Sequence, residues 1–509
     1  LEPGQRIHAL DSMGHNWWAV CVGAAGVAAL ALEDELPKAK QVAEAAAAGL
    51  REWEAFSGSE TQNKPPNYDE QGGFWEGVGY SNYSLLHCFL FAEAWQRARG
   101  EELGLECLVT GGEFFLHTAY PTGEGLHTVD FGDHHFTHPA GAPVVAWLAR
   151  ETQDARLAWY WQQADYKLDS AYTLLYWDPE LEPKAPEPQS LVFPAAGYAV
   201  RRDSFKADST LWAVKCGASW NHAHSDAGHF SLFHRGKRLL ADSGSCTYSH
   251  PAYREYYLHS QAHNVLLVEG KGQPQEDVYR GTHLLGRLSP FVEGQTVAYL
   301  RAECAGPYAS TCQRYYRHFL WVGSELLVVD DVITWQAARP TWLLHSEGKL
   351  EQLAEGRFLL CTGQAACTVE LAFPVAEVEQ RPGHPPGEPD VDWPYWAFTG
   401  AEEAPHHKLT ARIVPLEGTE PNAAAEMLSG EGWLGLEAES YRLFVNRLAD
   451  TTRVHQNSNN DFGGYETDAL LLLETPEELL LVDASYLRRG GKSLYEGLAK
   501  DVVVVLGEH

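Results

Sequence analysis

Four side chains that could form an active site lie between residues 219 and 268: His222, His224, Asp242 and His263. His222 and His224 are two residues apart, so they lie on one face if that stretch is extended. Asp242 ends one apolar run and His263 begins another. Three strand ends would bring together the imidazoles of His224 and His263 and the carboxylate of Asp242. Two nitrogens and a carboxylate oxygen suit zinc or a similar divalent ion. His222 would then lie beside the ion and be free to move protons.

A simpler interpretation stays open at this point. The chain has 23 histidines, so pairs two residues apart arise by chance, and a histidine in a strand commonly bonds the backbone. No CxxC or HExxH pattern marks a metal site. A metal site would also need groups that orient its ligands, and Asp226 is a candidate for that role.

Strands are predicted around these residues and through the rest of the chain. Segments 212–216 and 229–234 alternate between apolar and polar residues, which makes 221–228 the connection between two half-buried strands. Many short strands separated by turn residues predict a large antiparallel sandwich. Further strand candidates are 198–202, 319–322, 325–330, 341–345, 358–361, 368–373, 441–446, 469–474 and 479–483.

Helices are predicted before the strands, from residue 16 to about 176. Their alternation with long loops indicates an array of α-hairpins or a toroid. The candidate helices are 17–32, 38–56, 85–98, 103–117, 140–150 and 152–176. Four prolines between 177 and 190 indicate a linker, and the Pro-, Gly- and acid-rich segment 377–405 indicates a loop or a break. The expected domains are a helical domain 1–176, the linker 177–190, a β-sandwich 191–390 and a C-terminal β layer or subdomain 391–509.

Composition narrows the ligand class. A chain of 509 residues is too long for one core. A net charge of -31 excludes a generally basic surface for nucleic acid and argues against long-range attraction of a highly sulfated polymer. An anionic ligand would need a local basic groove, which Arg201, Arg202, Arg235, Lys237 and Arg238 could supply unless they are solvated strand charges. Aromatic residues make up 12% and suit sugar stacking, although most will be core.

The compartment is not determined by these features. Nine cysteines are an odd number without a framework spacing. We find no apolar run of membrane-spanning length and no signal-peptide pattern, but the chain begins at Leu1, so a leader or a larger piece could be absent.

Five motifs together resemble those of a known family. NHAHSDAGHF from residue 221, ADSG from 241 and AHN from 262 resemble the signature of the heparinase II/III-like polysaccharide lyases. HNWW from residue 15 and EGVGY from 76 resemble the two toroid motifs of that superfamily, in the expected order. Each motif alone is weak, whereas the combination is specific and covers nearly the whole chain.

The resemblance implies an α+β fold, with an α/α toroid packed on antiparallel β-sandwich layers and an active site in the cleft between them. One departure concerns the toroid. The family usually has several more helices before the Asn-Trp motif, and only 15 residues precede Asn16. We therefore expect an incomplete, N-terminally truncated toroid.

Such lyases cleave a uronate glycosidic bond by β-elimination, which requires three groups. One neutralises the carboxylate, a base removes the proton on the neighbouring carbon, and an acid protonates the leaving oxygen. By resemblance, Asn16 neutralises the carboxylate with help from His15. Tyr80 is the acid, or both acid and base, and His222 is the base or a carboxylate neutraliser. An ordinary helix N-cap is the alternative for Asn16, and a packed aromatic is the alternative for Tyr80.

The resemblance also implies the remaining site residues. His224, Asp242 and His263 match the metal ligands, and the ion, zinc by preference with calcium or no metal as alternatives, is mainly structural. Glu76, Tyr83, His135 and Tyr253 complete the candidate substrate-binding residues with His15. His135 could instead belong to a plain polar loop, and Tyr253 could be a packing residue.

The expected function is that of a carbon–oxygen lyase that acts on a glycosaminoglycan such as heparan sulfate, hyaluronan or chondroitin, or on alginate, and leaves unsaturated uronate ends. The alternative is a carbohydrate-binding protein without turnover. A glycan hydrolase would need two flanking carboxylates, and no convincing pair is present. The expected partner is an anionic polysaccharide, with no nucleic acid and no membrane. A homo-oligomer, endo or exo action, and the choice between a secreted or periplasmic and a cytoplasmic location stay open.

Overall fold

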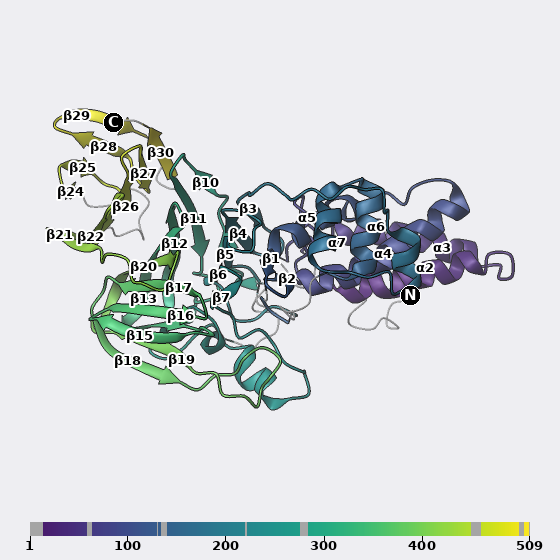
Figure 1. The fold of residues 1–509 in the computed structure, drawn as a ribbon, viewed down its shortest axis with the longest axis horizontal. Coiled ribbons are helices and arrows are strands. Elements are labelled where there is room, and N and C mark those ends of the chain that lie inside the picture. The colour runs from purple at the N-terminus through teal and green to yellow at the C-terminus, as the bar shows by residue number, and fades with distance from the viewer. Residues whose placement is uncertain are drawn as a thin grey trace.

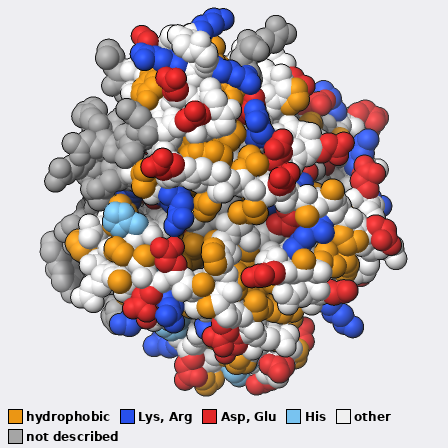
Figure 2. Space-filling view, turned by 90° about the vertical axis from the view of Figure 1, so that its left-hand side faces the viewer, with side chains coloured by type: hydrophobic (Ala, Val, Ile, Leu, Met, Phe, Trp, Pro, Cys, Tyr) orange, Lys and Arg blue, Asp and Glu red, His pale blue; other side chains and the backbone are white. Residues whose placement is uncertain are grey.

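The structure is a computed structural model that describes residues 14–58, 64–129, 131–133, 140–218, 221–274, 283–448, 460–497 and 503–507. Helices form one end of the molecule and β-sheets form the other (Figure 1). This order confirms the predicted α+β class with helices first. On the face of the sheets seen in Figure 2, Asp and Glu side chains are scattered among Lys and Arg and do not gather into one patch.

The helical end is built on α2 (Asn16–Ala31), which packs against α3 (Ala39–Glu54) and α4 (Val78–Arg99). Small residues allow close approach here: a Cβ on Gly23 would lie 2.8 Å from the His87 carbonyl oxygen. The remaining helices are α5 (Cys107–Thr118), α6 (Ala142–Thr152), α7 (Ala155–Gln163) and α8 (Ala171–Tyr176).

Two details of this half differ from expectation. A hairpin of β1 (Ala119–Thr122) and β2 (Gly125–Thr128) interrupts the helices. The single helix expected over 152–176 is divided into α7 and α8, because Asp165 has a positive φ of 53° and Ser170 starts a new helix with a capping box. The expected linker, 177–190, contains no helix or strand.

A five-stranded antiparallel sheet lies between the helices and the rest of the β-structure. Its order is β3 (Leu191–Phe193), β4 (Tyr198–Arg202), β5 (Thr210–Lys215), β6 (His229–His234) and β7 (Lys237–Leu240). Alternate residues face opposite sides, as a strand requires. Tyr198 and Val200 belong to the helical core, whereas Ala199 packs into the core shared with the next sheet.

That next sheet pairs its strands in the order β10-β11-β12-β13-β20-β17-β16-β15, with β9 beside β11. Its bounds are β9 (Arg287–Leu288), β10 (Val292–Glu293), β11 (Val297–Glu303), β12 (Cys312–Val322), β13 (Glu325–Ala338), β15 (Lys349–Ala354), β16 (Arg357–Thr362), β17 (Ala365–Leu371) and β20 (Ala404–Leu416). A four-stranded sheet shares its core and consists of β18 (Val375–Arg381), β19 (Tyr395–Gly400), β14 (Pro340–Leu344) and β8 (Leu266–Val268).

The C-terminal strands form two further sheets. One has the order β21 (Glu426–Gly430), β22 (Trp433–Ala438), β23 (Tyr441–Asn446), β26 (Leu471–Glu474), β27 (Glu478–Val482) and β30 (Val503–Gly507). The other has β24 (Asn460–Phe462), β25 (Tyr465–Thr467), β28 (Tyr486–Arg489) and β29 (Lys492–Glu496). The six-stranded sheet packs on the outer side of β11–β13.

Two expectations about the β-structure are corrected. The boundary expected at 390 falls before β19 and β20, which pair with β14, β13 and β17, so the sheets divide after Leu416. Segment 377–405, expected as a loop or break, contains most of β18 and all of β19. Its Pro- and Gly-rich part lies between them, and β18 is a charged strand at the edge of its sheet. Among the described residues, no helix is long and apolar enough to cross a membrane.

Candidate active site

The candidate residues meet where the helices face the five-stranded sheet. Asn16 begins α2, Tyr80 lies in the first turn of α4, and Asp133 follows the β1–β2 hairpin. His222 and His224 come from the β5–β6 connection, as predicted. The turn before them is sharp because Asn221 has a positive φ of 61°, a conformation that Asn tolerates better than most residues.

Asn16 links the helical side to His222. Its backbone N–H donates to Glu76 Oε1 at 2.8 Å and its Nδ2 donates to Glu76 Oε2 at 2.5 Å. Nδ2 also lies 3.3 Å from His222 Nε2. The N-cap of α2 is His15, whose Nδ1 accepts from the Trp17 N–H at 3.2 Å, so the simple N-cap interpretation of Asn16 does not hold. Asn16 Oδ1 is buried and has no hydrogen-bond partner among the described residues.

Tyr80 lies flat against His222. The two rings are nearly parallel, at 7°, with centroids 3.5 Å apart. The Tyr80 hydroxyl hydrogen-bonds the hydroxyl of Tyr248, which also lies 3.3 Å from His222 Nδ1. Burial, reinforced by the bond to Tyr248, raises the pKa of Tyr80 far above 10. Tyr80 is therefore a neutral phenol in the free protein, which suits a proton donor better than a base.

Asp133 is a buried carboxylate that receives several hydrogen bonds. Oδ1 lies 2.9 Å from His224 Nε2, and Oδ2 lies 3.0 Å from His222 Nδ1. Burial alone would raise its pKa, but the bonds from the two histidines outweigh burial and hold the pKa of Asp133 well below its usual range. Three hydroxyls complete the set: Ser245 at 3.0 Å, Tyr248 at 3.2 Å and Tyr253 at 2.9 Å.

The predicted metal ligands lie just behind this carboxylate. His263 Nδ1 lies 2.7 Å from Asp242 Oδ2, and all three predicted ligands are fully buried. The rings of His224 and His263 are 5.4 Å apart. Burial raises the pKa of Asp242, a shift that a nearby divalent cation would oppose, and lowers that of His263 to about 3, which keeps its imidazole neutral as a metal ligand requires.

These residues fit a cation. His224 Nδ1 and His263 Nε2 are both buried without a hydrogen-bond partner in the described part of the chain. The other nitrogen of each ring faces a carboxylate, so the unpartnered nitrogens carry the lone pairs. Two imidazole nitrogens and a carboxylate oxygen are a donor set that suits zinc.

His229, which was not predicted as a ligand, forms a second candidate set: its ligand atom lies within 4.8 Å of those of Asp242 and His263, and this set does not include His224. Its Nδ1 already accepts the Asn264 N–H at 2.8 Å, so its Nε2 carries the hydrogen, lies 2.9 Å from Ser231 Oγ and is 3.4 Å from Asp242. In this tautomer neither nitrogen of His229 has a free lone pair for a cation. The metal assignment of His224, Asp242 and His263 remains a prediction.

The structure brings most of the predicted residues together. His15 lies 5.9 Å from His222, measured between ring centroids, and Glu76 and Tyr253 make the contacts given above. Tyr83 is different: it is half-exposed on α4 and contacts His87. His135 lies outside the described residues. Asp133 was missed, and its only sign in the sequence was its place in the polar stretch DFGDHHFTH.

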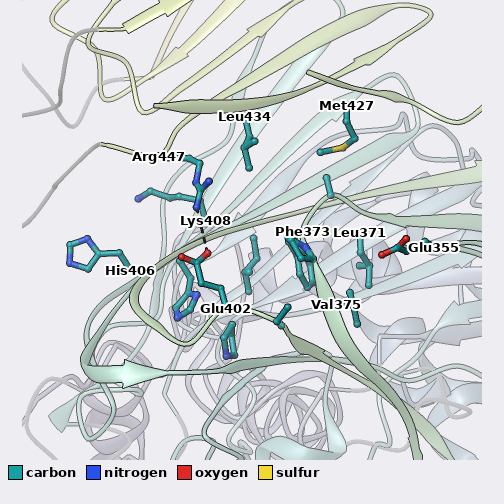
Figure 3. Close-up of a pocket in the computed structure, with 18 residues that line it drawn as sticks. Glu355, Leu371, Phe373, Val375, Glu402, His406, Lys408, Met427, Leu434 and Arg447 are labelled. Atoms are coloured by element: carbon teal, nitrogen blue, oxygen red, sulfur yellow. Dashed lines mark hydrogen bonds and ion pairs between the residues drawn. The ribbon is translucent and has the colours of Figure 1, made fainter. Parts of the chain in front are cut away.

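A separate cavity of about 430 Å³ lies between the outer sheets, lined by β17, β20 and β21–β22 (Figure 3). Leu371 and Phe373 supply apolar surface, and Glu402 pairs with Arg447 at 3.5 Å. None of the candidate residues lines this cavity.

Comparison with known proteins also separates the β-structure from the helical part of the chain. Residues 185–385 match the family model described as "Heparinase II/III-like, C-terminal". This part of the chain is therefore similar to heparinase II/III-like C-terminal domains. The predicted resemblance is therefore confirmed. The domain contains His222, His224, Asp242 and His263, whereas Asn16, Tyr80 and Asp133 lie before it.

This chain covers only part of the length of the relatives that it matches. A heparin-sulfate lyase of Bacteroides stercoris is 34% identical over 98 residues, which is 18% of this chain and 15% of that protein. A heparinase III structure matches with a TM-score of 0.63 and 14% identity, over 89% of this chain and 63% of its own. Heparan sulfate lyase HepC from Pedobacter heparinus matches with a TM-score of 0.61 and 15% identity, over 96% and 66%. At these identities, the structural matches show a shared fold.

Proposed function

We propose that this protein is a polysaccharide lyase that cleaves uronate-containing glycans by β-elimination. The observation that carries the proposal is that Tyr80 and Asn16 both contact His222, where the helices face the sheet. A carbohydrate-binding protein would not need a phenol, an imidazole and an amide in this arrangement. The heparinase II/III-like domain and the heparinase III fold support the same reaction class.

The roles follow from hydrogen positions. His222 Nδ1 donates to Asp133, so its Nε2 holds a lone pair and is the base that takes the proton from the carbon beside the uronate carboxylate. Tyr80, which keeps its proton, gives it to the leaving glycosidic oxygen. The carbon–oxygen bond then breaks and a carbon–carbon double bond forms. Asn16 would supply the uronate carboxylate with the amide hydrogen that now faces His222.

The cation site is proposed as His224, Asp242 and His263, with zinc as the preferred ion. When bound, the ion supplies positive charge that holds the β5–β6 connection in place behind His222. The helical half is proposed as part of an α/α toroid. The proposed substrates are glycosaminoglycans or alginate, with unsulfated or sparsely sulfated chains favoured by the net charge of -31.

The test is the ultraviolet absorbance of unsaturated uronate during incubation with heparin, heparan sulfate, hyaluronan, chondroitin sulfates and alginate. We expect wild type to act on at least one glycan and Tyr80→Phe to lose about 100-fold or more in kcat, because a general acid contributes roughly that much. Tyr83→Phe is the matched control, since Tyr83 lies one turn further along α4 and contacts His87 instead of His222. Glycan binding without absorbance would favour the carbohydrate-binding alternative, and equal loss in both variants would contradict the role of Tyr80.

A further inference from the structure

Asp133 occupies a position that joins the two halves of the site. It lies on the helical side, between β2 and α6, yet its backbone N–H donates to the His222 carbonyl at 2.9 Å. Gly132 before it has a φ of +73°, and a Cβ there would lie 2.3 Å from the same carbonyl oxygen. This loop is therefore pressed against the backbone of His222, which places the Asp133 carboxylate between the two imidazoles.

Each carboxylate oxygen of Asp133 accepts a hydrogen bond from one imidazole. Oδ1 lies 2.9 Å from His224 Nε2, and Oδ2 lies 3.0 Å from His222 Nδ1. An ionised carboxylate only accepts hydrogen bonds, so both of these nitrogens carry hydrogen. In a neutral imidazole the other nitrogen then holds the lone pair. Asp133 thus selects His222 Nε2 and His224 Nδ1 as the two lone-pair nitrogens.

The surroundings of those two nitrogens agree with this assignment. His222 Nε2 lies 3.3 Å from the Asn16 amide nitrogen, which can only donate, and Glu76 Oε2, 3.4 Å from the same Nε2, already accepts a hydrogen bond from that amide. His224 Nδ1 is buried with no hydrogen-bond partner among the described residues, and its ring lies beside that of His263. One nitrogen is the proposed proton acceptor, and the other faces the proposed cation position.

The carboxylate oxygens of Asp133 are occupied by hydrogen bonds from the protein and are not left to bind a ligand. Ser245 donates to Oδ1, and Tyr248 and Tyr253 donate to Oδ2, in addition to the two histidines. The side chain is only 1% exposed. These donors come from the β side, so they hold the carboxylate in one orientation between both imidazoles. The geometry points to a positioning role rather than to direct contact with substrate.

We propose that Asp133 is a positioning residue that sets the tautomers of His222 and His224 together, and so couples the proposed base to the proposed cation site across the helix–sheet boundary. The catalytic half of this inference rests on the proposed lyase function. The tautomers and the cation affinity can be measured without it.

The test compares wild type with Asp133→Asn, which keeps the size but offers one acceptor and one N–H group. One imidazole must then face a donor and move its hydrogen. Nitrogen-15 spectra of the histidine rings, assigned with His222→Gln and His224→Gln, should show that change. We also expect zinc affinity, measured against a competing chelator, to fall about 10- to 100-fold. On a cleaved glycan, kcat should fall about 100-fold with little change in KM.

Ser245→Ala is the matched control, because it removes a 3.0 Å hydrogen bond to the same carboxylate without replacing either histidine or their acceptor oxygens. Its tautomers should match wild type, with activity within about fivefold. If Asp133→Asn does not fold, Asp133→Glu tests the same point: it retains two acceptors, so both tautomers should persist while kcat falls. Unchanged tautomers and zinc affinity in folded Asp133→Asn, or changed tautomers in Asp133→Glu, would overturn the proposal. Changed tautomers and affinity in a protein inactive on every glycan would uphold it and reject the lyase function.

Discussion

At the scale of single residues, Glu76 orients Asn16 through hydrogen bonds, as we propose that Asp133 orients the two histidines. It accepts the backbone N–H and the side-chain Nδ2 of Asn16 with different oxygens, and its side chain is fully buried. This pairing sets the rotation of the amide, because only Nδ2 can donate to a carboxylate. The start of α2 and the amide that faces His222 are therefore held by one residue.

Replacement of Glu76 by Gln should disturb this amide. Gln presents an N–H group where the carboxylate had an oxygen, so the Asn16 side chain must turn or lose its partner. We expect kcat to fall about 10- to 100-fold, because a displacement of a reacting group by about 1 Å can lower the rate by that much. Steady-state kinetics on the cleaved glycan would measure it. Glu93→Gln is the control, because Glu93 pairs with Arg150 further along α4. Equal kcat in wild type and Glu76→Gln would contradict this role.

The sequence motifs predicted the residues that we propose to carry the chemistry, but not the residue that we propose to position them. Asn16, Tyr80 and His222 stand in short runs with recognisable neighbours. Asp133 lies in a loop whose path depends on how the helices pack on the sheet, and no spacing rule connects it to His222, 89 positions further on. The distinction between His224 and His229 also needed the structure, since it depends on the backbone N–H of Asn264.

At the scale of elements, the spacing of α2 and α4 sets the positions from which Asn16 and Tyr80 both contact His222. Gly23 and Gly26 face α4, and a Cβ on Gly26 would lie 2.5 Å from the Phe91 ring. Helix predictions from apolar, alanine-rich runs located α2 and α3 closely. They could not predict this contact, because close packing of a glycine depends on the partner helix.

Gly23→Ala should force α2 away from α4, because the new Cβ would meet the backbone of His87 at 2.8 Å. We expect a loss of about 1–3 kcal/mol in the free energy of unfolding, as in other overpacked cores, together with lower kcat. Urea denaturation and kinetics would measure both. Gly49→Ala in α3 is the matched control: its Cβ would have ordinary 3.7 Å contacts, so stability should rise by up to about 1 kcal/mol. The reverse order of stability would contradict the packing argument.

Strand predictions succeeded best in the interior of the sheets. The interpretation of 377–405 as a break was wrong because composition was averaged over two strands and the loop between them. In β18 the charged residues are exposed on an edge strand, where they do not oppose pairing. The boundary at 390 was wrong for a related reason: β20 follows a Pro-rich segment but pairs back with β13, and such long-range pairing is invisible in local composition.

At the scale of the whole molecule, Glu478 ties the C-terminal sheet to the central one. Its carboxylate accepts the backbone N–H groups of Gln295 at 2.6 Å, Thr296 at 2.9 Å and Val297 at 3.3 Å. Burial would raise the pKa of Glu478, but these bonds outweigh it and lower the pKa below its ordinary value of 4.5. The carboxylate therefore contributes stability above pH 4.5, and this contribution is lost as pH falls through the lowered pKa.

Glu478→Gln should lower the urea midpoint at pH 7, with a loss of about 1–3 kcal/mol for hydrogen bonds to a buried charge. The difference from wild type should shrink as pH falls below 4.5, because wild type then loses the same charge. Glu477→Gln is the control, since Glu477 is adjacent and exposed. A difference that is constant from pH 7 to pH 3 would contradict a role for the ionised carboxylate.

The central claim is that the site around His222, where the helices face the sheet, performs elimination. The most direct measurement is the mass spectrum of the products when wild type digests a susceptible glycan in water enriched in oxygen-18. Elimination takes no oxygen from water, so we predict unsaturated products without the heavy isotope. Saturated products that carry oxygen-18 would show hydrolysis and contradict the account.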